Sequence, residues 1–198
     1  MFNEINYASF FTINITDSCS IQNIIASNRI FRASLLAKCY FSITRYVEYE
    51  SIYKKRKSSK SGEQELIKKI QKAISENSIK VCDITIDDLN DRLIADNRKR
   101  LGMGEISSIA FAKRTGLGFL TDDKPAKKFA LKSLEASKVQ SSIHLVGWLF
   151  YFRHLVDTDI DLIIREHTYH NRHFGEHYRK AYEKAMQYRL TSPPRSET

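Results

Sequence analysis

The chain has 198 residues and a formal net charge of +9, with 32 Lys and Arg against 23 Asp and Glu. A hydrophobic content of 42% is enough for one packed domain, and seven glycines and three prolines argue against long disordered stretches. The most apolar run, residues 145–152, is far shorter than the roughly 20 residues that cross a bilayer, so we expect no membrane segment. Three cysteines with no C-x-x-C pair, and no signal-peptide pattern, predict a cytoplasmic protein without a cysteine zinc site.

The first half of the chain predicts strands that alternate with helices. We expect strands at 10–17, 40–44 and 79–85, and helices at 19–31, 32–40, 44–56, 62–78 and 86–100. In the predicted helix 44–56, Tyr46, Val47, Glu50 and Tyr53 fall on one face. We therefore expect this face, with Glu50 on it, to point inward.

The second half continues the alternation. It predicts a helix at 102–116 that ends at Gly116, a strand at 118–123, a helix at 124–134, a strand at 138–144 and helical sequence from about 145 to 190. Strands that alternate with helices in this way are typical of an α/β layered domain with a mostly parallel sheet.

Acidic residues follow two of the predicted strands. Asp17 ends the first strand, and Asp122 and Asp123 end the strand that begins at Gly118. Glu105 lies in the first turn of one predicted crossover helix, and Glu50 in the second turn of another. Because parallel strands end at the same edge of a sheet, we expect these acids to meet in one crevice.

Clustered carboxylates raise one another's pKa, and a divalent cation relieves the repulsion. Ligands that are all oxygen atoms favour Mg²⁺ or Mn²⁺ over zinc. The alternative is that Asp122 caps the helix beginning at Lys124 while Asp123 is solvated, since Asp is a common helix cap. The spacing alone does not choose between a metal site and a cap.

Three segments resemble the motifs of PIN-domain nucleases, which include the VapC-type toxins and related small prokaryotic PIN proteins. They are NITDSCSIQNII, VEYES and GEISSIAFAKRTGLGFLTDDKPAKKFA, and the third is the most specific. The resemblance covers residues 9–156. It implies a three-layer α/β/α sandwich with a sheet of four or five strands, and Mg²⁺- or Mn²⁺-dependent hydrolysis of phosphodiester bonds, mostly in RNA.

Carried over by motif, the resemblance implies that Asp17, Glu105, Asp122 and Asp123 bind the metal ions. Glu50 is the implied helix acid of the catalytic group, and Glu48 is its alternative. The order of Asp122 and Asp123 as ligands stays open. Thr121 matches a hydroxyl position that orients water or a phosphate.

The basic residues near these acids are candidates for drawing in a polyanion. We expect nucleic-acid contacts from Lys54, Lys55, Lys57, Lys124 and Lys127. The alternative is a solvated loop with ordinary charged helix faces.

We therefore expect a PIN-like nuclease domain at 1–156, a helical extension at 157–190 and a flexible tail at 191–198. The expected function is a metal-dependent endoribonuclease, as a toxin or a defence effector. A non-catalytic nucleic-acid-binding or scaffold protein and a DNA nuclease are the alternatives. Expected partners are RNA, an antitoxin or other protein, and a second copy in a homodimer; the extension suits an RNA-contacting arm, a dimer surface or a partner groove.

Overall fold

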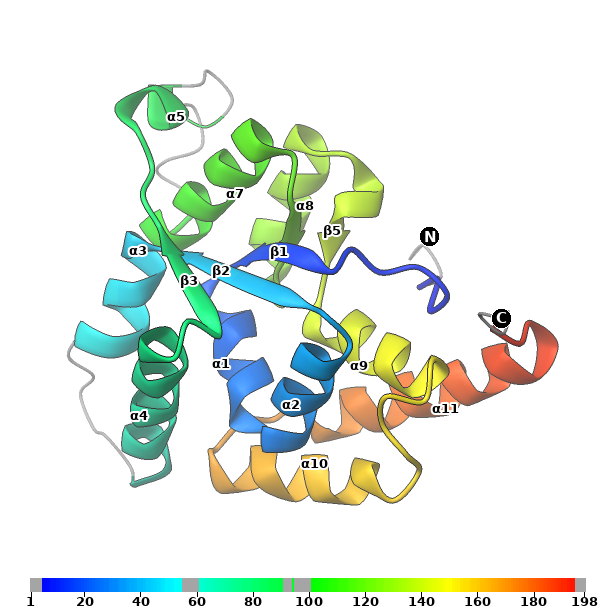
Figure 1. Ribbon diagram of the computed structural model, residues 1–198. Helices are drawn as coiled ribbons and strands as arrows, with labels where there is room; N and C mark the ends of the chain where they lie inside the picture. Colours follow the sequence, from blue (N-terminus) through cyan, green and yellow to red (C-terminus); the bar gives the residue numbers. More distant parts are fainter. Residues whose placement is uncertain (1–4, 55–60, 91–93, 95–100, 195–198) are drawn as a thin grey trace.

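The computed structural model describes residues 5–54, 61–90, 94 and 101–194, and it shows a parallel sheet between two layers of helices (Figure 1). Within these residues the sheet has five strands in the order β3-β2-β1-β4-β5, and every neighbouring pair is parallel. The strands are β1 (Ile13–Thr16), β2 (Tyr40–Thr44), β3 (Ile79–Cys82), β4 (Gly118–Leu120) and β5 (Val139–Gln140). The expected three-layer α/β/α sandwich is confirmed.

The longer helices divide between the two faces of the sheet. One face is covered by α7 (Met103–Thr115) and α8 (Lys124–Ser133). The other is covered by α1 (Ser18–Ala26), α2 (Asn28–Leu36), α4 (Ser61–Ser75), α9 (Ser142–Tyr151), α10 (Asp159–Tyr169) and α11 (Gly175–Thr191). The short elements are α3 (Arg45–Glu48), the π-helical turn η1 (Tyr49–Tyr53), α5 (Ile86–Asn90) and the 3₁₀ turn η2 (Ala136–Lys138).

The sheet separates two hydrophobic cores. Phe41, Ile43 and Leu120 belong to the core shared with α1, α2, α4, α9, α10 and α11. Ile15 and Phe119 belong to the core shared with α7 and α8. Because successive side chains of a strand point to opposite faces, the neighbours Phe119 and Leu120 contribute to different cores. Of the five strands, β4 (GFL) is apolar throughout, as buried parallel strands often are, while the others include polar residues such as Asn14 and Ser42.

Capping side chains set several boundaries that the sequence pattern missed. The helical sequence from 19 to 40 divides at Ser27, whose hydroxyl accepts a hydrogen bond from Ile30 N–H and begins α2. The strand expected at 138–144 has only two residues, because Ser141 caps α9 at His144 N–H. The helix at 102–116 ends as expected, with Gly116 in the left-handed region at φ 72°.

The expected inward face of the helix at 44–56 is wrong in part. The buried side is centred on Val47 and Ser51, while Tyr46 and Tyr53 are exposed. Glu50 lies at the edge of the buried side and is half-buried. The helix also changes to a π turn at Tyr49.

The structure describes only residues 86–90 and 94 of the expected helix at 86–100. The residues 86–90 form α5, and Ile94 is fully buried in the α7–α8 core. Residues 91–93 and 95–100 of the expected helix lie outside the described residues.

Residues 157–190 form helices that pack onto the domain, and the domain boundaries stay a prediction. α11 lies along α9, and Tyr178 of α11 is fully buried in the larger core. Figure 1 shows α10 and α11 beside α1, α2 and α9. None of the helices that the structure describes is both long and apolar enough to cross a membrane.

Replacing Gly147 with alanine tests the contact between α9 and the segment before β1. A β-carbon at Gly147 would lie 2.1 Å from Cε1 of the buried Tyr7. We expect Gly147→Ala to lower the free energy of unfolding by about 1–3 kcal/mol, because overpacking displaces the tyrosine ring. Urea denaturation followed by circular dichroism measures this.

The same substitution in a Tyr7→Ala background is the control. There the clash is gone, and alanine is a better helix former than glycine by roughly 1 kcal/mol, so Gly147→Ala should become neutral or stabilising. An equal cost in both backgrounds would show that the Tyr7 contact is not the reason for the glycine.

Candidate active site at the carboxyl edge of the sheet

Asp17 is the most deeply buried acid of the expected site. It follows β1 and caps α1, where its Oδ1 accepts a 2.7 Å hydrogen bond from Ser20 N–H. Its Oδ2 accepts a hydrogen bond from the Thr121 hydroxyl, and only 1% of Asp17 is exposed. The backbone N–H of Asp17 also bonds to Leu120 O at 3.3 Å, so the ends of β1 and β4 lie side by side.

The Asp122 carboxylate accepts two hydrogen bonds. Its Oδ2 accepts from the Asn23 side-chain amide at 2.8 Å, and its Oδ1 accepts from Ser142 N–H at 2.9 Å. These donors come from α1 and from the start of α9, on the face covered by α1. Asp122 therefore links two helices to the end of β4.

Asp123 turns toward the opposite layer and caps α8. Its Oδ1 accepts from Ala126 N–H at 2.7 Å, and its own N–H donates to the Thr121 hydroxyl at 3.2 Å. The capping alternative thus holds for Asp123 and not for Asp122, which reverses the expected assignment of the two. Thr121 is fully buried, so its hydroxyl orients Asp17 instead of facing a ligand.

Glu105 and Glu50 form the outer part of the acidic group. Glu105 lies in the first turn of α7 and accepts from Gly102 N–H at 2.7 Å. Glu50 accepts from Gly104 N–H at 3.3 Å, and a β-carbon at Gly104 would lie 2.3 Å from Glu50 Oε2. A larger residue at position 104 would therefore displace the flexible Glu50 carboxylate from its present place against α7. Glu48 is paired with Arg45 at 3.4 Å, so the structure favours Glu50 over Glu48 as the site acid.

An open crevice of about 470 Å³ lies over Glu50 and Glu105. It runs between the first turn of α1, the end of η1, the start of α7 and the loop between α10 and α11. Its lining residues are Ser18, Cys19, Gln22, Glu50, Lys54, Gly102, Glu105 and Arg172. Asp17, Asp122 and Asp123 are not among the lining residues; Asp17 is buried, and Asp122 and Asp123 are partly exposed.

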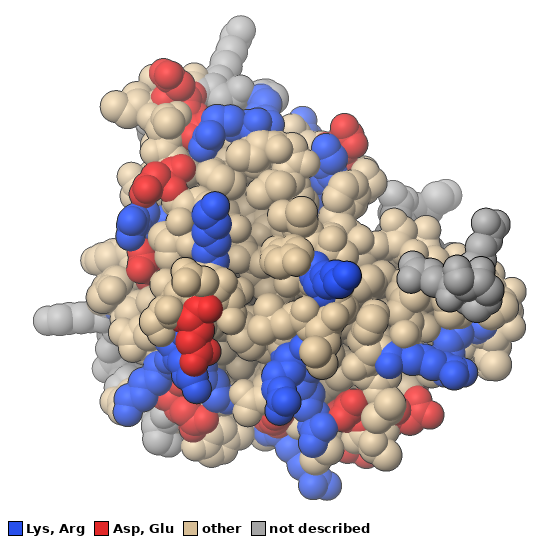
Figure 2. All heavy atoms as spheres, viewed as in Figure 1, with Lys and Arg blue, Asp and Glu red and all other residues tan. Residues whose placement is uncertain are grey.

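Only some of the lysines that we expect to contact nucleic acid can be placed near this edge. Lys54 lines the crevice, and Lys124 and Lys127 are exposed on the first turns of α8, next to Asp123. Lys55 and Lys57 lie outside the described residues. In the view of Figure 2, Lys and Arg side chains are spread among acidic ones and do not form a single basic patch.

Arg172 is a site residue that the sequence pattern did not single out. It reaches from the loop between α10 and α11 to α1, where its Nε donates to Asn23 Oδ1 at 2.7 Å. Its two other nitrogens donate to Gln22 Oε1 at 3.2 Å and to Cys19 O at 3.1 Å. Arg172 thus fixes the Asn23 amide so that its NH₂ group faces Asp122. No signal in the sequence connects residue 172 to residue 23.

The acids perturb one another's protonation. Burial raises the pKa of Asp17 to about 7, and the charge of Asp122 adds to the rise, while the bonds from Thr121 and Ser20 oppose it. Burial also raises the pKa of Glu105, as do the charges of Asp123 and Glu50, against the Gly102 bond. At this edge the ionised forms of Asp17 and Glu105 are therefore disfavoured.

The donor set at this edge suits Mg²⁺ or Mn²⁺, because it consists of carboxylate oxygens. Glu50 Oε2, Glu105 Oε1 and Asp123 Oδ2 accept no hydrogen bond from the described residues. Within the described parts of the chain, however, no three His, Cys, Asp or Glu side chains lie close enough together to hold one ion. The residue types fit the metal, and the metal assignment of Asp17, Glu105, Asp122 and Asp123 stays a prediction.

A comparison of the chain with protein families, with curated proteins and with solved structures finds no match. The likeness to PIN-domain nucleases therefore stays a prediction from the sequence motifs.

Asp17→Asn is expected to change how stability depends on pH. In the wild type the folded pKa of about 7 lies above the ordinary value near 4, so folding takes up a proton between these limits and stability falls as pH rises through them. Between pH 5 and pH 8 we expect Asp17 to cost the wild type on the order of 2 kcal/mol, while asparagine, also a good helix cap, carries no such cost. Urea denaturation at both pH values measures the difference.

A divalent ion at this edge would offset the same cost. We expect millimolar Mn²⁺ at pH 8 to raise the midpoint of the wild type and to leave that of Asp17→Asn nearly unchanged. If the stability of the two proteins depended on pH in the same way, Asp17 would not be the group whose raised pKa lowers stability at high pH.

Arg172→Ala tests the link between the extension and the site. We expect a loss of about 2–4 kcal/mol in the free energy of unfolding, because several hydrogen bonds to a charged group disappear and Asn23 loses its donor. Arg179→Ala is the matched control, since Arg179 makes an exposed ion pair with Asp161 at 2.6 Å and its loss should cost less than about 1 kcal/mol. Similar losses in the two variants would contradict a special role for Arg172.

Proposed function

We propose that this protein is a metal-dependent nuclease that hydrolyses phosphodiester bonds, with RNA as the favoured substrate. The observation that carries the proposal is the gathering of Asp17, Glu50, Glu105, Asp122 and Asp123 at one edge of the sheet. These acids come from four separate parts of the chain. A fold needs no such concentration of like charge for its stability, and it carries a cost in the raised pKa of Asp17 and Glu105.

The acids would have different roles. Glu50 and Glu105 line the crevice, and the buried Asp17 fixes the ends of β1 and β4 beside it, where Asp122 and Asp123 follow β4. A bound Mg²⁺ or Mn²⁺ ion supplies Lewis-acid stabilisation of the charge that develops on the phosphodiester. Lys54 at the crevice, and Lys124 and Lys127 on α8, offer cations to the phosphates on either side.

The resemblance to PIN-domain nucleases supports RNA over DNA and cytoplasmic action as a toxin or a defence effector. An antitoxin or other protein partner and a homodimer remain part of this proposal. The products that the resemblance implies carry 5′-phosphate and 3′-hydroxyl ends.

A second candidate is a nucleic-acid-binding or scaffold protein without catalysis. Three of the acids satisfy N–H groups at helix starts: Asp17 at α1, Asp123 at α8, and Glu105, which accepts from the N-cap Gly102 N–H of α7. Capping alone accounts for these three residues. Glu50 and Asp122 are not N-cap residues, but each also accepts a hydrogen bond from a first-turn N–H, that of Gly104 in α7 and that of Ser142 in α9.

Cleavage of end-labelled RNA and DNA in Mg²⁺, Mn²⁺ or EDTA tests the proposal. We expect metal-dependent cleavage of single-stranded RNA, and a loss of at least about 100-fold in Asp17→Asn, Asp122→Asn/Asp123→Asn and Glu105→Gln, since a catalytic ion contributes several kcal/mol. Glu135→Gln is the matched control, because Glu135 is exposed beside η2 at the amino end of β5. Full activity in the Asp17 and Asp122/Asp123 variants would refute the nuclease assignment, and binding without cleavage would favour the scaffold alternative.

A further inference from the structure

Three exposed tyrosines lie on one short helical segment beside the crevice. Tyr46, Tyr49 and Tyr53, here called the tyrosine surface, are 40%, 56% and 61% exposed. They belong to α3 and η1, directly after β2. Large aromatic side chains at this level of exposure contribute little to the core, and when they gather they mark a binding surface.

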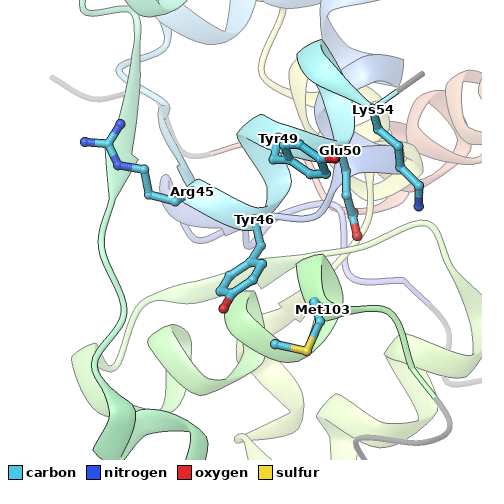
Figure 3. Close-up of a pocket in the computed structure, with 6 residues that line it drawn as sticks. All are labelled: Arg45, Tyr46, Tyr49, Glu50, Lys54 and Met103. Carbon is cyan, nitrogen blue, oxygen red and sulfur yellow. The ribbon is translucent and has the colours of Figure 1, made fainter. Parts of the chain in front are cut away.

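The tyrosine surface borders a second pocket of about 410 Å³, within the range of sites for small ligands. Arg45, Tyr46, Tyr49, Glu50, Lys54 and Met103 line it (Figure 3). In this view the Tyr46 ring extends toward Met103 of α7, and Glu50 and Lys54 point to the same side of the helix. Apolar and aromatic groups make up most of its wall, with charged groups at the ends.

The second pocket adjoins the acidic crevice. Glu50 and Lys54 line both. A ligand that extends from one to the other would therefore place an apolar, ring-shaped part beside Tyr46 and Tyr49 and a charged part beside Glu105 and Lys54. Nucleic acid has this combination, since a base alternates with a phosphate along the chain.

The backbone conformation of this segment helps to keep the three tyrosine rings on the outside. The segment changes from α-helix to a π turn, which closes with a 2.9 Å hydrogen bond from Lys54 N–H to Tyr49 O. A π turn adds a residue to the helical repeat and is found frequently at functional sites. Here Val47 and Ser51 stay buried while the tyrosines remain outside.

Charge at the ends of the segment favours a polyanion. Lys54 makes no ion pair with any residue that the structure describes. Arg45 at the other end pairs with Asp83 at 3.0 Å and with Glu48, and its side chain is still 63% exposed. A protein partner recognised by tyrosines alone would not explain why the same wall runs into the acidic crevice.

We propose that the tyrosine surface is a base-stacking site for single-stranded nucleic acid, placed to hold the nucleotides next to the bond that enters the crevice. Bases stack on aromatic rings only where they are not paired, so the site selects single strands over duplexes. Every base has an aromatic face, so selectivity for strandedness exceeds selectivity for sequence. This inference deepens the proposed nuclease function and rests on it.

Binding in EDTA tests the stacking site apart from any cleavage. The probes are a fluorescein-labelled single-stranded RNA of ten nucleotides, its abasic counterpart with the same phosphates, and the same strand in a duplex, each followed by fluorescence anisotropy. We expect Tyr46→Ala and Tyr49→Ala each to weaken binding of the single strand by about 5- to 100-fold. Tyr49→Phe should keep wild-type affinity, because the ring is retained.

Tyr40→Ala is the matched control. Tyr40 is 59% exposed, as the tyrosine surface is, and it lies at the start of β2, at the opposite edge of the sheet. Its loss should leave binding unchanged. For the wild type, the abasic strand and the duplex should bind about as weakly as the intact strand binds to Tyr49→Ala.

Several results would overturn the stacking site. The first is that the wild type binds the intact and the abasic strand with equal affinity. The second is that Tyr46→Ala and Tyr49→Ala both bind the single strand as tightly as the wild type. The third is that the wild type is a dimer and these substitutions dissociate it. The last would assign the surface to a second copy of the chain. If the tyrosine variants cleave RNA in Mn²⁺ as fast as the wild type, the nuclease proposal holds and the stacking site is refuted. If binding depends on the tyrosines but no cleavage is seen, the stacking site holds and the nuclease proposal is refuted.

Discussion

The burial of the Asp17 carboxylate at the junction of β1, α1 and β4 is the constraint on which the rest of the site depends. One oxygen receives the Thr121 hydroxyl and the other receives Ser20 N–H, so the carboxylate fixes the turn into α1 and the end of β4 at once. Thr121 in turn accepts Asp123 N–H, which sets the start of α8. A buried charge that organises three elements is costly, and the raised pKa of Asp17 records that cost.

The C-terminal helices take part in this arrangement. Arg172 holds the Asn23 amide, the amide donates to Asp122, and Asp122 accepts Ser142 N–H at the start of α9. The Ser142 hydroxyl is also 2.9 Å from the buried Tyr178 hydroxyl of α11. Residues 157–190 thus support the acidic edge through hydrogen bonds, although the sequence places them outside the motif-bearing region.

The layered fold could be predicted from the sequence because strand and helix patterns are local. Apolar strands such as 118–120 and the amphipathic helix at 61–75 read directly from their periodicity. The gathering of the acids was also predictable, since parallel strands end at one edge. The orientation of each side chain was not, because it depends on distant donors: which of Asp122 and Asp123 caps a helix is decided by Asn23, Ser142 and Ala126. The exposed tyrosines were missed because the inward face was centred on the large side chains, whereas the buried side is centred on Val47 and the small Ser51.

The close approach of Glu50 to α7 has a consequence for how this chain can vary. Any side chain at position 104 would occupy the space of the Glu50 carboxylate, and the Gly104 N–H would lose its acceptor if Glu50 withdrew. Because this carboxylate ends a flexible side chain, a larger residue at position 104 would push it away from α7. Variation at position 104 would therefore move the acid at position 50 without replacing it.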